Sequence, residues 1–381
     1  MHFYESSIIT TKDGLQCQVY GNEHPMDRIL VKPKYIPTDK LECEALQCRF
    51  ISGKKMNRLN LWADKKKLKD YIENFRKAYP QYVYLSPVHK GGRFFFSIPH
   101  DNIERIYFPR RGLSELLKMP YESLDEHLKI VYDFINFLLK SGLRVKDLGI
   151  TYSTLMGHYF KDISDINIVV YGKENFWKLT DYLKAVKHPK LRWKTKQDWL
   201  RFRNGRNRFA IFTEDEFLHL MDRKKSEGYF DNNLFVIFGT EKEEEAWFKW
   251  GEENYSSLGL ATVEGIVADN FSSVVRPGFY GIKDSKIIAG SKESKELDKK
   301  KLDVKKIVFY SRDYCMIAYP GEKIRACGIL EKVEPEKGKA EGKAEGKVEE
   351  KGEKEPYYRV VVGYFDAYVN DRREKEFVKV V

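Results

Sequence analysis

The chain has 381 residues, which is long for one domain and predicts two or three. Hydrophobic residues make up 42% of the sequence and aromatic residues 14%, which is enough for folded cores, and no stretch reaches the roughly 18 apolar residues that a membrane span needs. The N-terminal segment lacks the apolar core of a signal peptide, so we expect a soluble, cytoplasmic protein without a membrane partner. Lys and Arg outnumber Asp and Glu by 68 to 57, and nucleic acid is the commonest partner of such a basic surplus.

Charge and cysteine content narrow the class further. Charged residues of both signs reach 33%, a composition that resembles that of thermophile proteins. The five cysteines are an odd number without C-x-x-C spacing, and Cys43 and Cys48 have no second pair or nearby histidine. This pattern favours reduced thiols over a zinc site.

Residues 1–112 are predicted to form an α/β module. The segments 15–21 and 28–37 are typical of strands, and "GNEHP" between them supplies turn residues. Residues 64–80 place apolar side chains at helical spacing before Pro80, and 93–99 is a further strand candidate.

Residues 113–257 form the second predicted domain. A helix is expected to begin at a capping box of Ser123 and Glu126 and to end at Gly142. A strand, a short turn-helix and a buried strand follow within 143–172. Three further elements are expected: a helix at 174–187, a helix at 214–228 and a buried strand at 233–240.

Residues 258–381 consist of short strands separated by turns, a pattern typical of a small β-barrel. A Lys/Glu/Gly tract at 334–356 interrupts them. Because it offers no apolar side chains to bury, we expect a surface loop without chemistry.

Two adjacent segments, "GITYSTLMG" (149–157) and "SDINIVVYG" (164–172), resemble the nucleotidyltransferase signature of the DNA polymerase β superfamily, and more narrowly a family of archaeal predicted nucleotidyltransferases. "DGLQCQVYGNEHPMDRILVKPKYIP" near the start and "ACGILEKV…YYRVVVG" near the end extend the resemblance over nearly the whole chain. It implies an α+β chain whose centre has a polymerase-β-type fold. It also implies Mg²⁺-dependent transfer of a nucleotide from a nucleoside triphosphate to a hydroxyl of RNA or protein, with tRNA-like substrates as the superfamily precedent.

The resemblance assigns roles to specific residues. Tyr152, Ser153 and Thr154 would form the turn that approaches the triphosphate. Asp165 and Asn167, two residues apart on a strand, would point to one side and hold Mg²⁺ as the catalytic pair, with Ser153 on the facing turn. Asp269 is the candidate third metal ligand, with Glu264 and Asp231 as alternatives.

Two positions depart from the signature. Tyr152 stands where glycine is expected, and Asn167 stands where the second carboxylate is expected. An amide brings no negative charge to offset two dications and a triphosphate, so both departures predict a catalytically impaired site. His158 near the turn is either a base or phosphate donor, or an ordinary hydrogen-bonded histidine.

The segment 190–208 is strongly basic. Its candidate RNA contacts are Arg192, Lys194, Lys196, Arg201, Arg203, Arg206 and Arg208. The aromatic residues among them would either stack on bases or be buried on one face of a helix.

The sequence therefore predicts a nucleotidyltransferase-like, RNA-binding pseudoenzyme. The first alternative is an active Mg²⁺-dependent nucleotidyltransferase. The second is a non-catalytic subunit of a larger complex, with protein partners.

Overall fold

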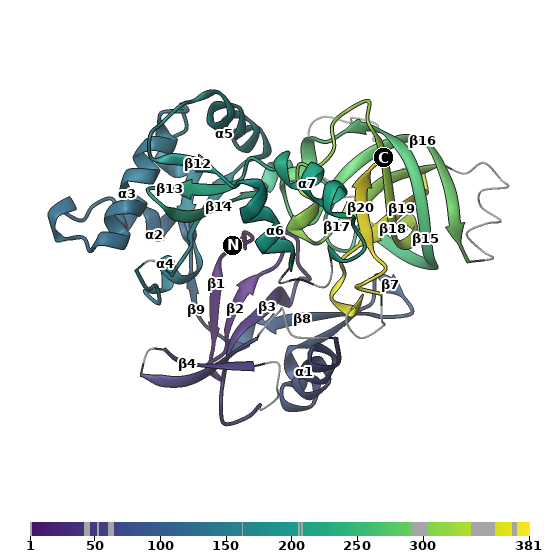
Figure 1. Cartoon of the computed structure of the whole chain (residues 1–381). Coiled ribbons are helices and arrows are strands. Elements are labelled where there is room, and N and C mark those ends of the chain that lie inside the picture. Colours follow the sequence, from purple (N-terminus) through teal and green to yellow (C-terminus); the bar gives the residue numbers. More distant parts are fainter. Residues whose placement is uncertain are drawn as a thin grey trace, which may run out of the picture.

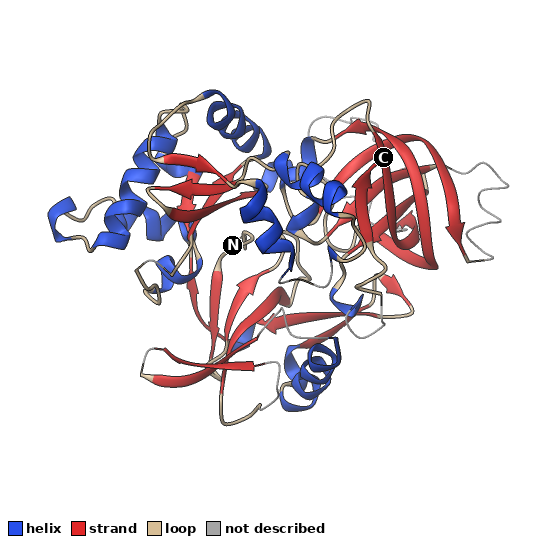
Figure 2. Cartoon of the chain, in the orientation of Figure 1, coloured by secondary structure: helices blue, strands red, loops and turns tan. Residues whose placement is uncertain are grey.

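The computed structural model describes residues 2–41, 46–51, 53–59, 65–161, 163–204, 206, 209–291, 303–336, 355–367 and 372–381. Within these residues the chain forms seven α-helices and three β-sheets (Figure 1), and Figure 2 shows helices and strands mixed throughout. The predicted α+β class is confirmed. A helix with the length and apolar character needed to cross a bilayer is not found among the described residues.

The first sheet has eight strands in the order β4–β5–β3–β2–β1–β9, with β8 paired to β3 and β6 paired to β8. Its elements are β1 (Ile8–Thr11), β2 (Gln16–Val19), β3 (Arg28–Pro37), β4 (Leu46–Ile51), β5 (Lys54–Leu59), α1 (Lys65–Ala78), β6 (Val83–Ser86), β8 (Arg93–Pro99) and β9 (Ile103–Tyr107). Helix α1 packs Tyr71, Ile72 and Phe75 into one buried cluster with the strands, because these side chains recur at helical spacing.

The central sheet has five strands in the order β10–β11–β14–β13–β12, of which only β11 and β14 are parallel. The elements of this region are α2 (Pro109–Leu116), α3 (Glu126–Leu139), β10 (Leu148–Ile150), α4 (Tyr152–Met156), β11 (Ile166–Tyr171), α5 (Lys173–Ala185), β12 (Leu191–Trp193), β13 (Glu227–Phe230) and β14 (Asn233–Thr240). Alternate residues Ile166, Ile168 and Val170 of β11 enter one buried cluster with residues of α3 and α5. The other alternate residues of β11 therefore face away from these helices.

Helix α3 begins two residues later than the capping box predicts. Asp125 is the N-cap, and its side chain accepts a hydrogen bond from the Leu128 N–H at 2.9 Å. Ser123 lies in a short 3₁₀ turn, and its hydroxyl donates to the Pro120 carbonyl at 2.7 Å. The capping box was wrong because the preceding proline turn takes up the serine hydroxyl.

The third sheet has seven strands. Its elements are β7 (His89–Lys90), β15 (Glu253–Asp269), β16 (Gly278–Gly290), β17 (Val304–Phe309), β18 (Lys323–Pro335), β19 (Tyr357–Val362) and β20 (Phe377–Val380). The pairings run β15–β16–β17–β19–β18, and β18 also pairs with β15 along most of its length. The predicted tract 334–356 connects β18 to β19, and its residues 337–354 lie outside the described residues.

Helices α6 (Lys196–Asn204) and α7 (Glu214–Asp222) pack on the third sheet (Figure 1). Trp199, Phe209 and Phe217 share a buried cluster with Val263, Ile307 and other residues of that sheet. The packing of these helices thus crosses the predicted domain boundary at residue 257.

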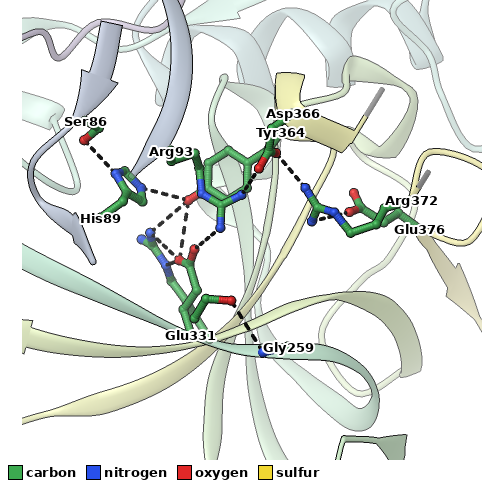
Figure 3. A network of polar contacts seen from close by, with 11 residues as sticks. Ser86, His89, Arg93, Gly259, Glu331, Tyr364, Asp366, Arg372 and Glu376 are labelled. Carbon is green, nitrogen blue, oxygen red and sulfur yellow. Dashed lines mark hydrogen bonds and ion pairs between the residues drawn. The ribbon is translucent and has the colours of Figure 1, made fainter. Parts of the chain in front are cut away.

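A buried ionic network joins the first sheet to the third (Figure 3). Arg93 of β8 contacts Glu331 of β18 at 3.3 Å and Asp366 at 2.8 Å. Arg359 of β19 contacts the other oxygen of Glu331 at 3.0 Å. Because all these side chains are largely withdrawn from water, loss of one partner would leave a buried unpaired charge, and the network fixes how the two sheets meet.

Candidate functional site

The two signature residues lie at the start of β11. Asp165 immediately precedes the strand and Asn167 is its second residue, on the face turned away from α3 and α5. Strand β10 runs antiparallel beside β11 and leads directly into α4, which contains Tyr152, Ser153 and Thr154. The local order strand, turn-helix, strand follows the sequence prediction.

Asn167 has a structural task in this arrangement. It is 9% exposed, and its side-chain amide donates to the Asp165 carbonyl at 3.0 Å. The backbone carbonyl of Asn167 accepts a hydrogen bond from the Thr151 N–H at 3.1 Å, and this bond links β11 to the turn before α4. The amide nitrogen therefore holds the entry of the strand together.

The carboxyl of Asp165 lies in a partly desolvated and largely cationic neighbourhood. Burial raises its pKa, the nearby charge of Glu227 adds to this, and Lys194, Arg58 and Lys34 act in the opposite direction. Arg58 and Lys34 belong to β5 and β3, so strands of the first sheet face this end of the central sheet.

Tyr152 occupies the position where the resembled signature has glycine. Its backbone is left-handed, with φ of 53°, a conformation that glycine adopts without steric cost. The hydroxyl accepts from Arg312 at 3.1 Å, and the Lys34 ammonium lies 3.5 Å from the centre of the ring. The Tyr152 side chain is therefore held in place by cations from two other parts of the chain.

Ser153 and Thr154 face different surroundings. Ser153 lines a small cavity of about 20 Å³ together with Tyr152, Lys34 and His158. Thr154 is buried, and its hydroxyl is hydrogen-bonded to His127 at 3.1 Å. Burial lowers the pKa of His158, which favours a neutral ring. Of the two hydroxyls, Ser153 is the one placed to meet a ligand.

The predicted third ligand, Asp269, lies at the end of β15 in the third sheet, where it is exposed and its carboxylate accepts from the Phe271 N–H at 3.0 Å. A different carboxylate shares the face of Asn167. In the strand registers Asn167 is opposite Val236, and Val236 is opposite Glu227, so the three residues form one row across β11, β14 and β13. Two strand spacings separate Asn167 from Glu227, roughly 10 Å.

Glu227 was not among the site residues that the sequence predicted. The predicted helix at 214–228 included Glu227, but α7 ends at Asp222 and Glu227 is the first residue of β13. Only the register of β13 on β14 aligns it with Asn167.

Two lysines neutralise Glu227. Lys194 contacts one carboxylate oxygen at 2.6 Å and Lys224 contacts the other at 3.3 Å, and their side chains are only 5% and 4% exposed. Although burial alone would raise the pKa of Glu227, the two ammonium groups lower it to about 2. Both oxygens are thus committed to lysines within the protein.

This arrangement does not suit a pair of magnesium ions. The ions need several carboxylate oxygens directed at one point, and two buried ammonium groups beside Glu227 would repel them. A cluster of three or more His, Cys, Asp or Glu able to hold a metal is not found in the described part of the chain.

The basic segment is largely engaged within the protein. Arg192 pairs with Asp198 at 2.7 Å, and Arg203 donates to the Phe212 carbonyl and Arg206 to the Phe202 carbonyl at 2.8 and 2.7 Å. Lys196 and Arg201 are exposed, the latter with 78% of its side chain accessible. Arg208 lies outside the described residues.

The aromatic residues of this segment are mostly internal. Trp199 is buried in the core that α6 and α7 share with the third sheet, as is Phe209 just after the segment, and Trp193 and Phe202 are partly buried. Of the two interpretations that the sequence left open, the packing favours the buried helix face.

Comparison with known proteins adds one relative. An uncharacterized protein of the archaeon Methanocaldococcus jannaschii is 26% identical over 374 residues, which cover 96% of this chain and 98% of the relative. No protein-family model matches the chain, and no solved structure matches it. The similarity thus spans all three sheets, while the name of the relative specifies no activity.

Proposed function

We propose that the chain is a nucleotidyltransferase-like protein of polymerase-β type, with a closed C-terminal barrel, that has lost metal-dependent transfer and binds RNA. The order β10, α4, β11 supports this fold, because it sets Ser153 and Asp165 on either side of one strand-turn-strand unit. The role of RNA rests on the net charge of +11 and on the exposed cations of α6.

The pairing of Glu227 with Lys194 and Lys224 carries the claim of impaired catalysis. Two-metal transfer requires concentrated negative charge to hold the metals against a triphosphate. Here the second signature carboxylate is Asn167, and the carboxylate in the same row is neutralised by ammonium groups. An ammonium fixed in the protein supplies positive charge but cannot activate a bound hydroxyl as a metal does.

RNA binding is tested through the cations that are exposed. We would compare K196Q/R201Q with wild type by fluorescence anisotropy on labelled tRNA over a series of salt concentrations. Each lost phosphate contact should reduce the salt slope by about 0.7 to 0.9, because fewer counterions are released. Arg203 and Arg206 are left intact, since their contacts with backbone carbonyls belong to the fold.

The matched control is K54Q/K55Q, which removes the same charge from exposed positions on β5. Equal slopes for the two double variants would refute a role of α6. Failure of wild type to bind RNA would refute the RNA function and favour a non-catalytic subunit with protein partners.

Catalysis is tested in the same preparation. Wild type with Mg²⁺, labelled nucleoside triphosphates and RNA should transfer no label, and D165N should bind RNA as wild type does. Label transfer by wild type that D165N abolishes would refute impairment and favour the active nucleotidyltransferase.

A further inference from the structure

A second cavity, of about 240 Å³, opens between the first and third sheets. On the side of the first sheet, the cavity is lined by Tyr20, which directly follows β2, and by Lys32 of β3. On the side of the third sheet, it is lined by Arg312, Tyr364 and Arg373. Asp165, Asn167 and Ser153 do not line it, but Arg312 of its lining donates to the Tyr152 hydroxyl at 3.1 Å, so the cavity lies next to the signature site.

The cavity carries an excess of positive charge. Its lining contains four basic side chains, Lys32, Arg276, Arg312 and Arg373, against two acidic ones, Asp313 and Glu376. Glu376 is itself paired with Arg372 at 2.9 Å, outside the lining.

Behind the wall, the carboxylate of Glu5 contacts both Arg276 and Arg312 with the same oxygen. Two guanidinium groups therefore share one negative charge. Arg276 is only 9% exposed, and its Nε is buried without a hydrogen-bond partner among the described residues. A buried donor without a partner is unfavourable, and an acceptor at that position would remove the penalty.

The wall beside these arginines is aromatic. The rings of Tyr20 and Tyr310 are stacked at 5.8 Å, and the ring of Phe365 lies 4.8 Å from that of Tyr20. Tyr310 also packs against Tyr364, with ring centres 4.7 Å apart, whereas Phe365 is half-buried and lines the cavity. A planar base suits such a wall, as bases stack on aromatic side chains in many nucleic-acid sites.

We propose that this cavity binds a nucleoside phosphate, with the phosphate on Arg276 and its basic neighbours and the base against the aromatic wall at Phe365. The ligand is either a free mononucleotide or the phosphorylated 5′ end of an RNA. Both sources present the same chemistry to the cavity. The inference does not require RNA binding through α6, and the two can fail separately.

The test is isothermal titration of the full chain with AMP, ribose 5-phosphate and inorganic phosphate. AMP should bind with a dissociation constant below about 1 mM, and more tightly than the two probes without a base. A dinucleotide with a 5′-phosphate is compared with its 5′-hydroxyl form, and stronger binding of the phosphorylated dinucleotide than of AMP would identify the RNA end as the source.

R276Q should weaken AMP binding by about tenfold or more, because it removes a charge-assisted donor. R373Q, at a half-buried position of the lining, gives a second reading if R276Q unfolds. R111Q, an exposed arginine on α2, is the matched control and should bind as wild type. Absence of AMP binding, equal binding of AMP and phosphate, or unaltered affinity in both R276Q and R373Q would each overturn the proposal.

Discussion

Replacing Glu227 by Gln tests whether this carboxylate is a structural partner of lysines or a ligand kept for a metal. In the structure it lies between Lys194 and Lys224, all three side chains being buried or nearly so. E227Q keeps the size of the side chain and removes its charge. Two buried ammonium groups would then lose the carboxylate that contacts them, and the protein should be less stable.

The pKa of Glu227 gives the expected size of this loss in the free energy of unfolding. Its folded value of about 2 lies below the usual 4.5, so the unfolded chain binds the proton more readily. The pairing therefore stabilises the fold above pH 4.5, and this contribution is lost as pH falls from 4.5 to about 2. A difference of this size corresponds to about 3 kcal/mol, near the 3–5 kcal/mol typical of breaking a buried pair.

The assay is guanidinium unfolding followed by tryptophan fluorescence, at pH 7 and at steps down to pH 2.5. E227Q should lose about 3 kcal/mol at pH 7 and show a weaker decline with acid than wild type. E244Q, at an exposed position, is the matched control and should match wild type. A triple variant, K194M/K224M/E227L, should recover much of the loss because it leaves no unpaired charge.

Unaltered or increased stability of E227Q would refute this reasoning. Carboxylates maintained for metal binding repel one another in the metal-free protein, and their removal commonly stabilises the fold. That result would favour a role for Glu227 in metal binding.

Three further predictions concern other parts of the chain. Y152F removes the hydroxyl that accepts from Arg312 and should cost about 1 kcal/mol in the same unfolding assay, whereas equal stability would show that the contact contributes nothing. Deleting residues 337–354 should leave the melting temperature nearly unchanged by calorimetry, because Val333 and Tyr357 are paired neighbours that a short linker can join. A large drop would mean that this tract stabilises the body. Burial holds the pKa of His89 well below 6.5, so the unfolded chain binds a proton at this histidine at a higher pH than the folded chain does. The free energy of unfolding should therefore decline as pH falls below 6.5. H89Q should weaken that decline, and an identical pH profile for H89Q and wild type would refute this prediction.

Several elements could be predicted from the sequence because their causes are local. Strands β8 and β14 have the predicted bounds, and α1 and α5 lie within two residues of theirs, since apolar periodicity and nearby prolines act over a few residues. The strand that contains Asn167 could be predicted in the same way, although Asp165 lies one residue before it. The sequence also identified Tyr152 as the departure from glycine.

What only the tertiary structure decided depends on residues far apart in the chain. Glu227 aligns with Asn167 because β13 and β11 both pair with β14, and no local pattern encodes that register. The sequence did not decide whether Trp199 and Phe209 contact RNA bases or lie in a core. The third sheet decided it, because this sheet supplies the apolar surface that covers both side chains, and most of its strands come later in the chain. Glu5 contacts both Arg276 and Arg312 because the fold brings three separate segments together, and no local sequence pattern predicts that these segments meet.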